Sequence, residues 1–251
     1  MSAPPRPKEP LRPQALLAQA ARDAARRHTP TGLGLDSAAM RQRMVARLRA
    51  EGAGCEPVWQ AMAEVPRHRF VDSALAAQAY EDTSLPIGFG QTISKPSVVA
   101  RMLEWLFLGT TARASGHLGR VLEIGTGCGY QTALLAALAR QVVSIERVQG
   151  LHDAARRHLT AQAVLHSRLL YADGMAGHAP SAPYDSIIAA AGGDDVPEAW
   201  LTQLAVGGRL VAPARAPGGG QVLVVVDRTA EGLRRSLGEA VQFVPLKSGR
   251  I

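Results

Sequence analysis

Three glycines in alternating positions, Gly125, Gly127 and Gly129, form the part of this sequence that is best suited to binding chemistry. They follow an apolar run at residues 120–124 and begin a helical pattern at residues 129–139. Glycine allows positive φ angles and lets a ligand approach the backbone closely, and the first N–H groups of a helix lack partners within that helix. The pattern predicts a nucleotide-type site at the carboxyl end of a strand. A tight turn without a ligand is the alternative if the glycines are taken alone.

The spacing of these glycines separates two cofactor classes. The pattern G-x-G-x-G differs from the G-x-G-x-x-G fingerprint of dinucleotide-binding proteins, which argues against a nicotinamide enzyme. With the acidic Glu123 near the end of the preceding strand, the run resembles the first motif of S-adenosylmethionine-dependent methyltransferases. The resemblance implies that S-adenosyl-L-methionine is the cofactor.

Two further predicted strands end in acidic residues. Glu146 follows the strand predicted at 141–145, and a carboxylate at that point can accept hydrogen bonds from ribose hydroxyls. Asp173 and Gly174 follow the strand predicted at 169–171, where a carboxylate could accept from an adenine amino group. Each acid alone could be a solvated loop residue, and Asp173 could be a turn former before glycine. With the glycine turn, these two acidic strand ends make three strand ends that favour one binding site.

The chain from residue 120 onward alternates between strand and helix patterns. The predicted strands lie at 120–124, 141–145, 169–171, 185–190, 208–212, 221–227 and 240–244, and the predicted helices at 129–139, 148–163 and 197–205. This alternation predicts an α/β fold with a doubly wound, mostly parallel sheet. The resemblance of the glycine run to methyltransferases implies that this sheet is of the Rossmann-like methyltransferase kind. The last two strands lack a helix between them, and Glu231-Gly232 is a turn signal, so we expect an antiparallel hairpin.

The N-terminal part has a different composition from the sheet-forming part. An Ala-rich segment at 14–28 could form a helix, and helical patterns follow at 36–51 and 56–65, the first capped by Asp36 or Ser37. The predicted domains are a basic, disordered or loosely helical extension at 1–35, a small helical N-terminal subdomain at 36–80 and the S-adenosylmethionine-dependent methyltransferase domain at 81–251.

Composition and charge restrict the remaining function classes. The net charge is +7, from 28 Lys and Arg against 21 Asp and Glu, but much of the excess lies in the N-terminal extension. Charge therefore argues only weakly for nucleic-acid binding, and an aromatic content of 4% argues against stacking on RNA. The 2 cysteines lack paired-ligand spacing, and neither a membrane span nor a secretory signal is evident. We expect a cytoplasmic protein in which Cys128 packs within the glycine turn and is not a nucleophile.

Four short runs outside the glycine turn are more specific. They are Val65-Pro-Arg67, Leu85-Pro-Ile-Gly88, Gly90-Gln-Thr-Ile-Ser94 and Phe243-Val-Pro-Leu246. Through these runs, residues 38–251 resemble the protein-L-isoaspartate (D-aspartate) O-methyltransferase family. The resemblance implies methyl transfer to the free carboxyl of L-isoaspartyl and D-aspartyl residues in damaged proteins. The methyl ester then collapses to a succinimide, which initiates repair.

The resemblance also implies roles for individual residues. It identifies Ser94 as the active-site serine, and it assigns the donor site to Gln91, Thr92, Ile93, Glu123, Gly125, Gly127, Glu146, Asp173 and Gly174. The implied partners are proteins or peptides that contain isoaspartate, without a specific nucleic acid or a membrane, and we expect a monomer. Two alternatives stay open: a methyltransferase for RNA or a small molecule, and a non-catalytic donor-binding protein.

A carboxylate acceptor fits the lack of a Ser/His/Asp or metal-binding arrangement in the sequence. A carboxyl with a pKa of about 3.9 is ionised at neutral pH, so it needs no general base to attack a methyl group. A dry site that aligns the reacting atoms is sufficient. Ser94 precedes Lys95-Pro96 and an apolar helix, so it is also predicted to be a helix N-cap. A serine there could also bind the substrate carboxylate.

The run after the fourth predicted strand departs from the family pattern. Asp195 and Glu198 predict a capping box for the next helix. Asp194 has no such role, and a carboxylate that faced the substrate would repel it. We therefore expect Asp194 to point to solvent.

Overall fold

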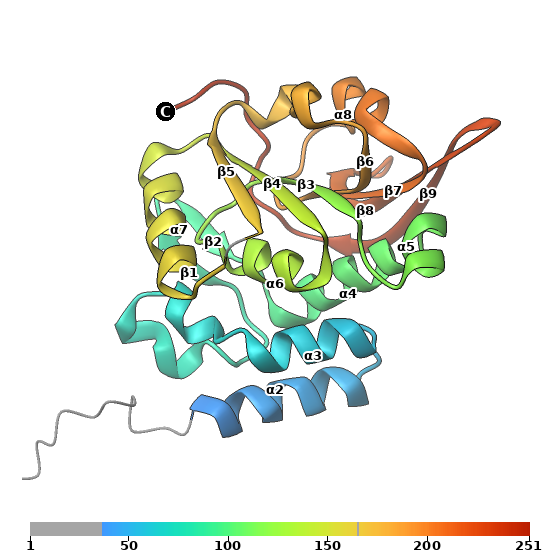
Figure 1. Ribbon diagram of the computed structural model, residues 1–251. Helices are drawn as coiled ribbons and strands as arrows, with labels where there is room; N and C mark the ends of the chain where they lie inside the picture. Colours follow the sequence, from blue (N-terminus) through green and yellow to red (C-terminus); the bar gives the residue numbers. More distant parts are fainter. Residues whose placement is uncertain (1–36, 165) are drawn as a thin grey trace, which may run out of the picture. The chain divides into compact units, whose positions relative to one another are not determined.

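A seven-stranded sheet forms the centre of the protein (Figure 1). The computed structural model describes residues 37–164 and 166–251, so the predicted extension at 1–35 and its helix at 14–28 lie outside the described residues. The strands are β3 (Arg120–Ile124), β4 (Gln141–Glu146), β5 (Ser167–Tyr171), β6 (Tyr184–Ala189), β7 (Leu204–Arg215), β8 (Gln221–Thr229) and β9 (Gly232–Val241). Strands β3 to β7 pair in parallel, whereas β8 and β9 pair antiparallel. The predicted α/β class, the mostly parallel sheet and the terminal hairpin are therefore confirmed.

The strand order changes direction at β3. The order across the sheet is β5-β4-β3-β6-β7-β8-β9, so β3 lies between β4 and β6. The chain passes to one side of β3 with β4 and β5 and to the other side with β6. Glu123 of β3 lies opposite Ser144 of β4, and Ile124 lies opposite Ala189 of β6. Open parallel sheets form a crevice at such a switch point, beyond the carboxyl ends of the strands. The glycine turn after β3 lies at this crevice.

Alternate residues of the strands pack into two separate apolar cores. Val121 and Val142 belong to one core, whereas Leu122 and Val143 belong to the other, because successive strand residues point to opposite faces. The second core is covered by α8 (Glu198–Gln203), which buries Trp200. The first core is covered by α2 (Ser37–Ala50), α3 (Glu56–Glu64), α4 (Pro96–Phe107), α5 (Thr110–Ser115), α6 (Tyr130–Leu138) and α7 (Gln149–Ala161). Both faces are thus covered, as a parallel sheet requires.

The N-terminal helices share their core with the sheet domain. Met44 and Leu48 of α2 and Met62 of α3 belong to the same apolar cluster as Leu103 of α4 and Leu134 of α6. Residues Ser37–Ile251 accordingly form one compact unit. The helices predicted at 36–51 and 56–65 are present, and they complete the core beneath the sheet.

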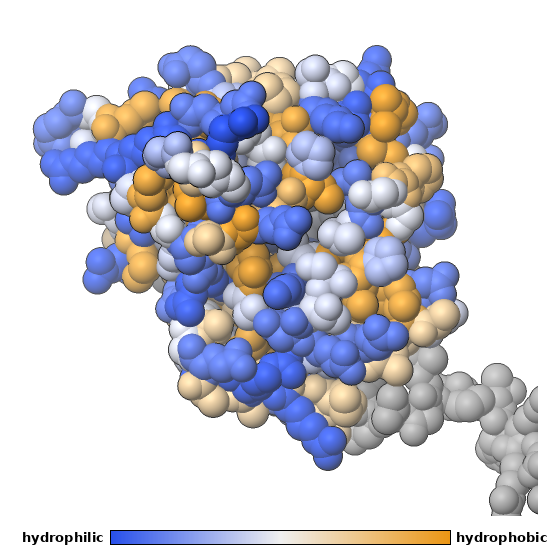
Figure 2. All heavy atoms as spheres, turned by 180° about the vertical axis from the view of Figure 1, so that it is seen from behind, coloured by the Kyte–Doolittle hydropathy of each residue, from blue (hydrophilic) through white to orange (hydrophobic). Residues whose placement is uncertain are grey.

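Three β-elements differ clearly from the sequence-based expectation. Strand β7 spans Leu204–Arg215 instead of 208–212, so it begins within the helix predicted at 197–205. Strand β9 spans Gly232–Val241 instead of 240–244, and nearly all of its residues are exposed. An exposed strand carries no apolar alternation, which explains why its first residues were missed. The β8–β9 hairpin projects from the body of the domain in Figure 1. Figure 2 shows the opposite face of the molecule, where hydrophilic side chains surround small apolar patches. A short antiparallel hairpin of β1 (Leu85–Gly88) and β2 (Gln91–Ile93) was not predicted as strands.

Candidate active site

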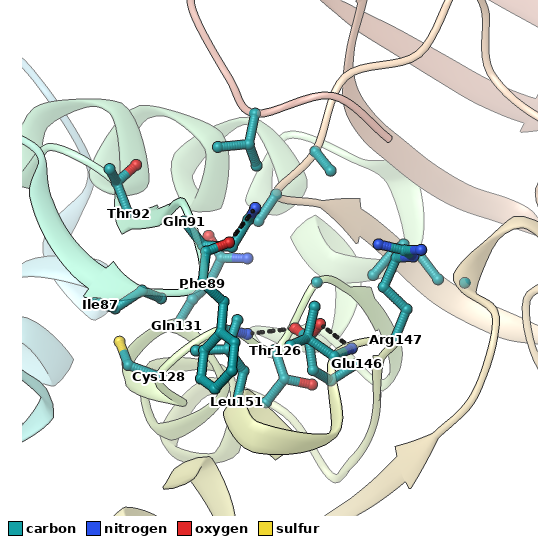
Figure 3. A pocket seen from close by; sticks show the side chains of 18 of the residues that line it. Ile87, Phe89, Gln91, Thr92, Thr126, Cys128, Gln131, Glu146, Arg147 and Leu151 are labelled. Atoms are coloured by element: carbon teal, nitrogen blue, oxygen red, sulfur yellow. Dashed lines mark hydrogen bonds between the residues drawn. The ribbon is translucent and has the colours of Figure 1, made fainter. Parts of the chain in front are cut away.

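A cavity of about 200 Å³ lies at the switch point of the sheet (Figure 3). Its walls come from segments far apart in the sequence: the β1–β2 hairpin, the glycine turn, the end of β4 and the C-terminal segment. The predicted site residues that line it are Gln91, Thr92, Ile93, Ser94, Gly125, Gly127, Glu146 and Gly174. Glu123 and Asp173 are not part of the lining. The structure therefore brings together most of the residues that the sequence placed in one site.

The glycine turn adopts a backbone that requires glycine. The φ angles of Gly125, Gly127 and Gly129 are +89°, +56° and +92°, in the region that side chains disfavour. Gly129 is also the N-cap of α6, and a Cβ added there would lie 3.3 Å from Cγ of Leu159 in α7. The predicted positive φ angles are confirmed, and the turn presents backbone instead of side chains to the cavity.

Glu146 is fixed by two backbone amides at the wall of the cavity. Its Oε2 accepts a hydrogen bond of 2.9 Å from the N–H of Gly127, and its Oε1 accepts one of 2.9 Å from the N–H of Val148. The residue is buried, with an exposed fraction of 5%. A carboxylate oxygen has further lone pairs beyond those used here. Glu146 therefore couples the glycine turn to the end of β4 and retains capacity to accept bonds from a ligand (Figure 3).

Glu123 lies behind the cavity wall, fully buried between β3, β4 and α6. It accepts hydrogen bonds from Oγ1 of Thr132 at 2.5 Å, from Oγ of Ser144 at 2.7 Å and from Nε2 of Gln131 at 3.1 Å. Burial raises the pKa of Glu123 to about 7, against the lowering effect of these donors. Its position suits a residue that holds the glycine turn and α6 together, without reaching the cavity itself.

The prediction that Ser94 caps α4 is wrong. The N-cap position is Lys95, and no side-chain cap bond is formed there. Asp82 satisfies the helix start instead, because its carboxylate accepts from the N–H of Ser97 at 2.8 Å and from Oγ of Ser97 at 2.7 Å. Ser94 lines the cavity, and within the described residues no hydrogen bond occupies its hydroxyl. Its hydroxyl is therefore available to a ligand and is not committed to the helix.

A buried arginine that was not predicted holds the backbone of the site. The guanidinium of Arg67 donates to the carbonyl of Ser94 at 2.7 Å and to the carbonyl of Ala79 at 2.8 Å. Its Cζ lies 4.9 Å from the ring centroid of Tyr130, a residue of the cavity wall. The sequence places Arg67 only in a family-like run, and its charge gives no local indication that the side chain is buried.

Asp173 connects the third strand end to the C-terminal segment. Its Oδ1 accepts from the N–H of Met175 at 2.9 Å, as expected of a turn former, and its Oδ2 accepts from the N–H of Gly249 at 2.7 Å. Arg147 donates to the carbonyl of Gly249 at 2.8 Å, and its own carbonyl accepts from the N–H of Ile251 at 2.8 Å. The C-terminal segment thus forms a wall of the cavity that the sequence did not indicate.

Cys128 lacks the properties of a nucleophile, and the described residues form no cluster suited to a metal ion. Cys128 is buried, and burial raises the pKa of its thiol to about 11, so it stays protonated at neutral pH. This confirms its packing role. Between residues 37 and 251, with position 165 left out, no group of three His, Cys, Asp or Glu side chains could hold a metal ion.

The two aspartates of the run that departs from the family pattern, Asp194 and Asp195, lie outside the cavity lining. Asp194 is largely exposed and pairs with Arg215 at 2.6 Å, so its predicted orientation to solvent is confirmed. The predicted capping box is wrong, because the N-cap of α8 is Pro197 and it forms no side-chain cap bond. Asp195 instead pairs with Arg235 of β9 at 2.6 Å, and hydrogen bonding to Arg235 lowers the pKa of Asp195. A partner on a distant strand gives no local sequence signal.

Comparison with known proteins identifies relatives over nearly the whole chain. The family described as Protein-L-isoaspartate(D-aspartate) O-methyltransferase (PCMT) matches residues 39–251. A protein-L-isoaspartate O-methyltransferase of Methylibium petroleiphilum is 63% identical over 95% of this chain and 88% of the relative, and one of Leptothrix cholodnii is 60% identical over 96% and 84%. A solved protein-L-isoaspartate O-methyltransferase is 28% identical, with a TM-score of 0.73 over 83% of this chain and 66% of the other. A second structure, a putative enzyme of this kind from Plasmodium falciparum in complex with S-adenosyl-L-homocysteine, shares the fold at 22% identity, with a TM-score of 0.70 over 82% of this chain and 98% of the other.

Proposed function

The chain belongs to the protein-L-isoaspartate(D-aspartate) O-methyltransferase family, and from this premise we propose the function of its cavity. The protein transfers a methyl group from S-adenosyl-L-methionine to the free carboxyl of L-isoaspartyl and D-aspartyl residues in damaged proteins, which initiates their repair. The observation that carries this proposal is the shared cavity. The hairpin residues Gln91 to Ser94 and the glycine turn with Glu146 line one space at the switch point of the sheet.

The donor is assigned to the side of the cavity formed by the glycine turn and Glu146. Gly125 and Gly127 let the donor approach the backbone, and Glu146 accepts hydrogen bonds from its ribose hydroxyls. Asp173 and Gly174 are assigned to the adenine side, where Asp173 also holds Gly249. Glu123 contributes from behind the wall through its bonds to Thr132 and Ser144. Of these acids, Glu146 is the one that lines the cavity, and its carboxylate has the lone pairs that ribose hydroxyls require.

The acceptor carboxylate is assigned to the hairpin side, beside Ser94. Bound S-adenosyl-L-methionine supplies an activated methyl group on a positively charged sulfur. The Ser94 hydroxyl donates to one carboxylate oxygen, which leaves the other free to face the methyl group. Gln91, Thr92 and Ile93, which line the cavity beside Ser94, are assigned to the methyl donor. Alignment of the reacting atoms and exclusion of water accelerate the reaction, because the positive charge of the sulfonium and the negative charge of the carboxylate both disappear during the transfer.

Paired peptides test this function directly. The protein should methylate a peptide with one isoaspartyl residue and leave the aspartyl isomer unmodified, and the label should be released by mild base, as a methyl ester is. Equal rates on both isomers would contradict the proposal. A base-stable label on RNA would favour the alternative class, which the family assignment does not support.

The proposed function also implies the partners, the oligomeric state and the cellular location of the protein. The partners are isoaspartyl proteins and peptides, and no helix in the described part of the chain has the length and apolar character to cross a bilayer. We propose a monomer that works in the cytoplasm, where its substrates age. Light scattering on the purified protein and cell fractionation are the measurements that check these two points.

A further inference from the structure

Phe89 has a conformation that needs an explanation. It lies at the tip of the β1–β2 hairpin with a φ of +53°, between Gly88 at +88° and Gly90 at +66°. A bulky residue with positive φ is uncommon and costs energy, and such strain concentrates at functional sites. The side chain is also 65% exposed. The fold therefore tolerates both a strained backbone and an exposed aromatic ring at one position.

The ring of Phe89 is seated on a glycine of another element. A Cβ added to Gly150 of α7 would lie 2.2 Å from Cζ of Phe89, so the ring occupies the space that any other residue would fill. Gly150 does not have a positive φ, so its backbone does not require glycine. Glycine is also a poor helix former. The close approach of Phe89 is the one feature at this position that accounts for it.

The seated ring forms part of the cavity wall. Phe89 and Leu151 both line the cavity, and Figure 3 shows the Phe89 ring between the hairpin and the region of Leu151 and Glu146. The backbone carbonyl of Phe89 accepts from Nε2 of Gln91 at 3.3 Å, which ties the tip of the hairpin to a second cavity-lining residue. One side chain thus bridges the hairpin and α7 across the space assigned to the donor.

We propose that Phe89 is a positioning residue that closes the donor side of the cavity by resting on Gly150. The seated ring covers the donor beside Glu146 and fixes the hairpin that carries Gln91 to Ser94. This inference rests on the proposed function, because it assumes that the adenosyl donor occupies the cavity. It predicts that two different substitutions have the same effect on donor binding. One removes the ring of Phe89, and the other adds a Cβ to Gly150 that displaces the ring.

The test compares Phe89→Ala and Gly150→Ala, with S-adenosyl-L-homocysteine as the probe in calorimetry. Both variants should raise the Kd of the probe about tenfold, the change that corresponds to about 1.4 kcal/mol. Gly150→Ala should keep or raise the melting temperature, because alanine favours the helix. Its weaker binding could not then be ascribed to unfolding. Phe89→Tyr, which preserves the ring, should bind normally.

Controls separate this inference from the proposed function. Leu237→Ala removes another exposed apolar side chain, on β9, and should leave the Kd unchanged. In turnover assays, both test variants should raise the KM for S-adenosyl-L-methionine more than the KM for the isoaspartyl peptide. Normal probe binding by Gly150→Ala would overturn the role of Phe89 while the proposed function stands. Absence of probe binding by the unmodified protein would overturn the proposed function and this inference with it.

Discussion

The guanidinium of Arg67 donates a hydrogen bond of 2.7 Å to the backbone carbonyl of Ser94. Arg67 is fully buried, and burial lowers the pKa of its guanidinium. Its bond to Ala79, at 2.8 Å, connects the same group to the segment before β1. Both hydrogen-bond partners are backbone carbonyls, and burying a charge without an acidic partner is costly. The burial of Arg67 is therefore best explained by its role in fixing the backbone of the active-site serine.

Replacing Arg67 with lysine should therefore impair both stability and turnover. Lysine keeps the positive charge but lacks the planar fork that reaches two carbonyls. We expect a loss of about 1.5–3 kcal/mol in the free energy of unfolding, and a fall in kcat of about tenfold to a hundredfold from misplacement of Ser94. Urea denaturation and peptide methylation measure the two effects. Arg69→Lys, a change of an exposed arginine two residues away, is the matched control, and equal behaviour of both variants would contradict the prediction.

Glu146→Gln should weaken donor binding. A neutral amide in place of the carboxylate removes a charge-assisted acceptor, worth about 1.5–3 kcal/mol, so the Kd for S-adenosyl-L-homocysteine should rise by about tenfold or more. The melting temperature should also fall, because the carboxylate holds the N–H groups of Gly127 and Val148. Calorimetry gives the Kd, and the exposed Glu231→Gln serves as control. An unchanged Kd would mean that the ribose lies elsewhere.

The features that the sequence predicted correctly are local ones. The glycine turn and Glu146 each follow their strand directly, so a few adjacent residues specify both conformation and chemistry. The features that were missed depend on residues distant in the chain. Asp82 caps α4 through Ser97, 15 residues further on, and no local pattern distinguishes that cap from one made by Ser94. Arg67 was missed for a related reason, because a charged residue gives no sequence signal of burial.

The N-terminal extension should be dispensable for methyl transfer. Deletion of residues 1–33 should leave the melting temperature and kcat nearly unchanged, since the family match begins at residue 39. A longer deletion through residue 49 should destabilise the protein, because it removes Met44 and Leu48 from the core. Thermal denaturation and peptide methylation of both truncated proteins check this. A large loss on the shorter deletion would show that the extension supports the enzyme directly.

Glu123 should make the stability of the protein depend on pH. Burial raises its pKa from an ordinary value of 4.5 to about 7 in the folded state. Between these values the folded protein keeps a proton that the unfolded chain releases, so stability falls as pH rises from 4.5 through 7. Glu123→Gln cannot ionise and should lack this dependence. Between pH 4 and pH 8 the unmodified protein should lose on the order of 3 kcal/mol of unfolding free energy relative to Glu123→Gln.

Urea denaturation across this pH range gives the required free energies. The exposed Glu64→Gln is the matched control and should follow the unmodified protein at every pH. A constant difference between Glu123→Gln and the unmodified protein would show that Glu123 has the same charge in both states.

Ser94 and Asp82 should separate catalysis from helix capping. Asp82→Ala removes the cap of α4 and should cost about 0.5–2 kcal/mol of stability, with turnover of the folded fraction nearly normal. Ser94→Ala should leave stability nearly unchanged, because Ser94 does not cap the helix. Its turnover should fall about tenfold or more, since it loses a hydrogen bond to a charged substrate.

Ser94→Asp provides the sharper comparison. It should stay folded for the same reason, yet it places a negative charge against an anionic substrate, so methylation of an isoaspartyl peptide should collapse. Melting temperatures and kcat for the three variants give the complete comparison. A stable Ser94→Asp protein with near-normal isoaspartyl methylation would show that the substrate carboxylate binds elsewhere in the cavity, away from the serine that Arg67 holds in place.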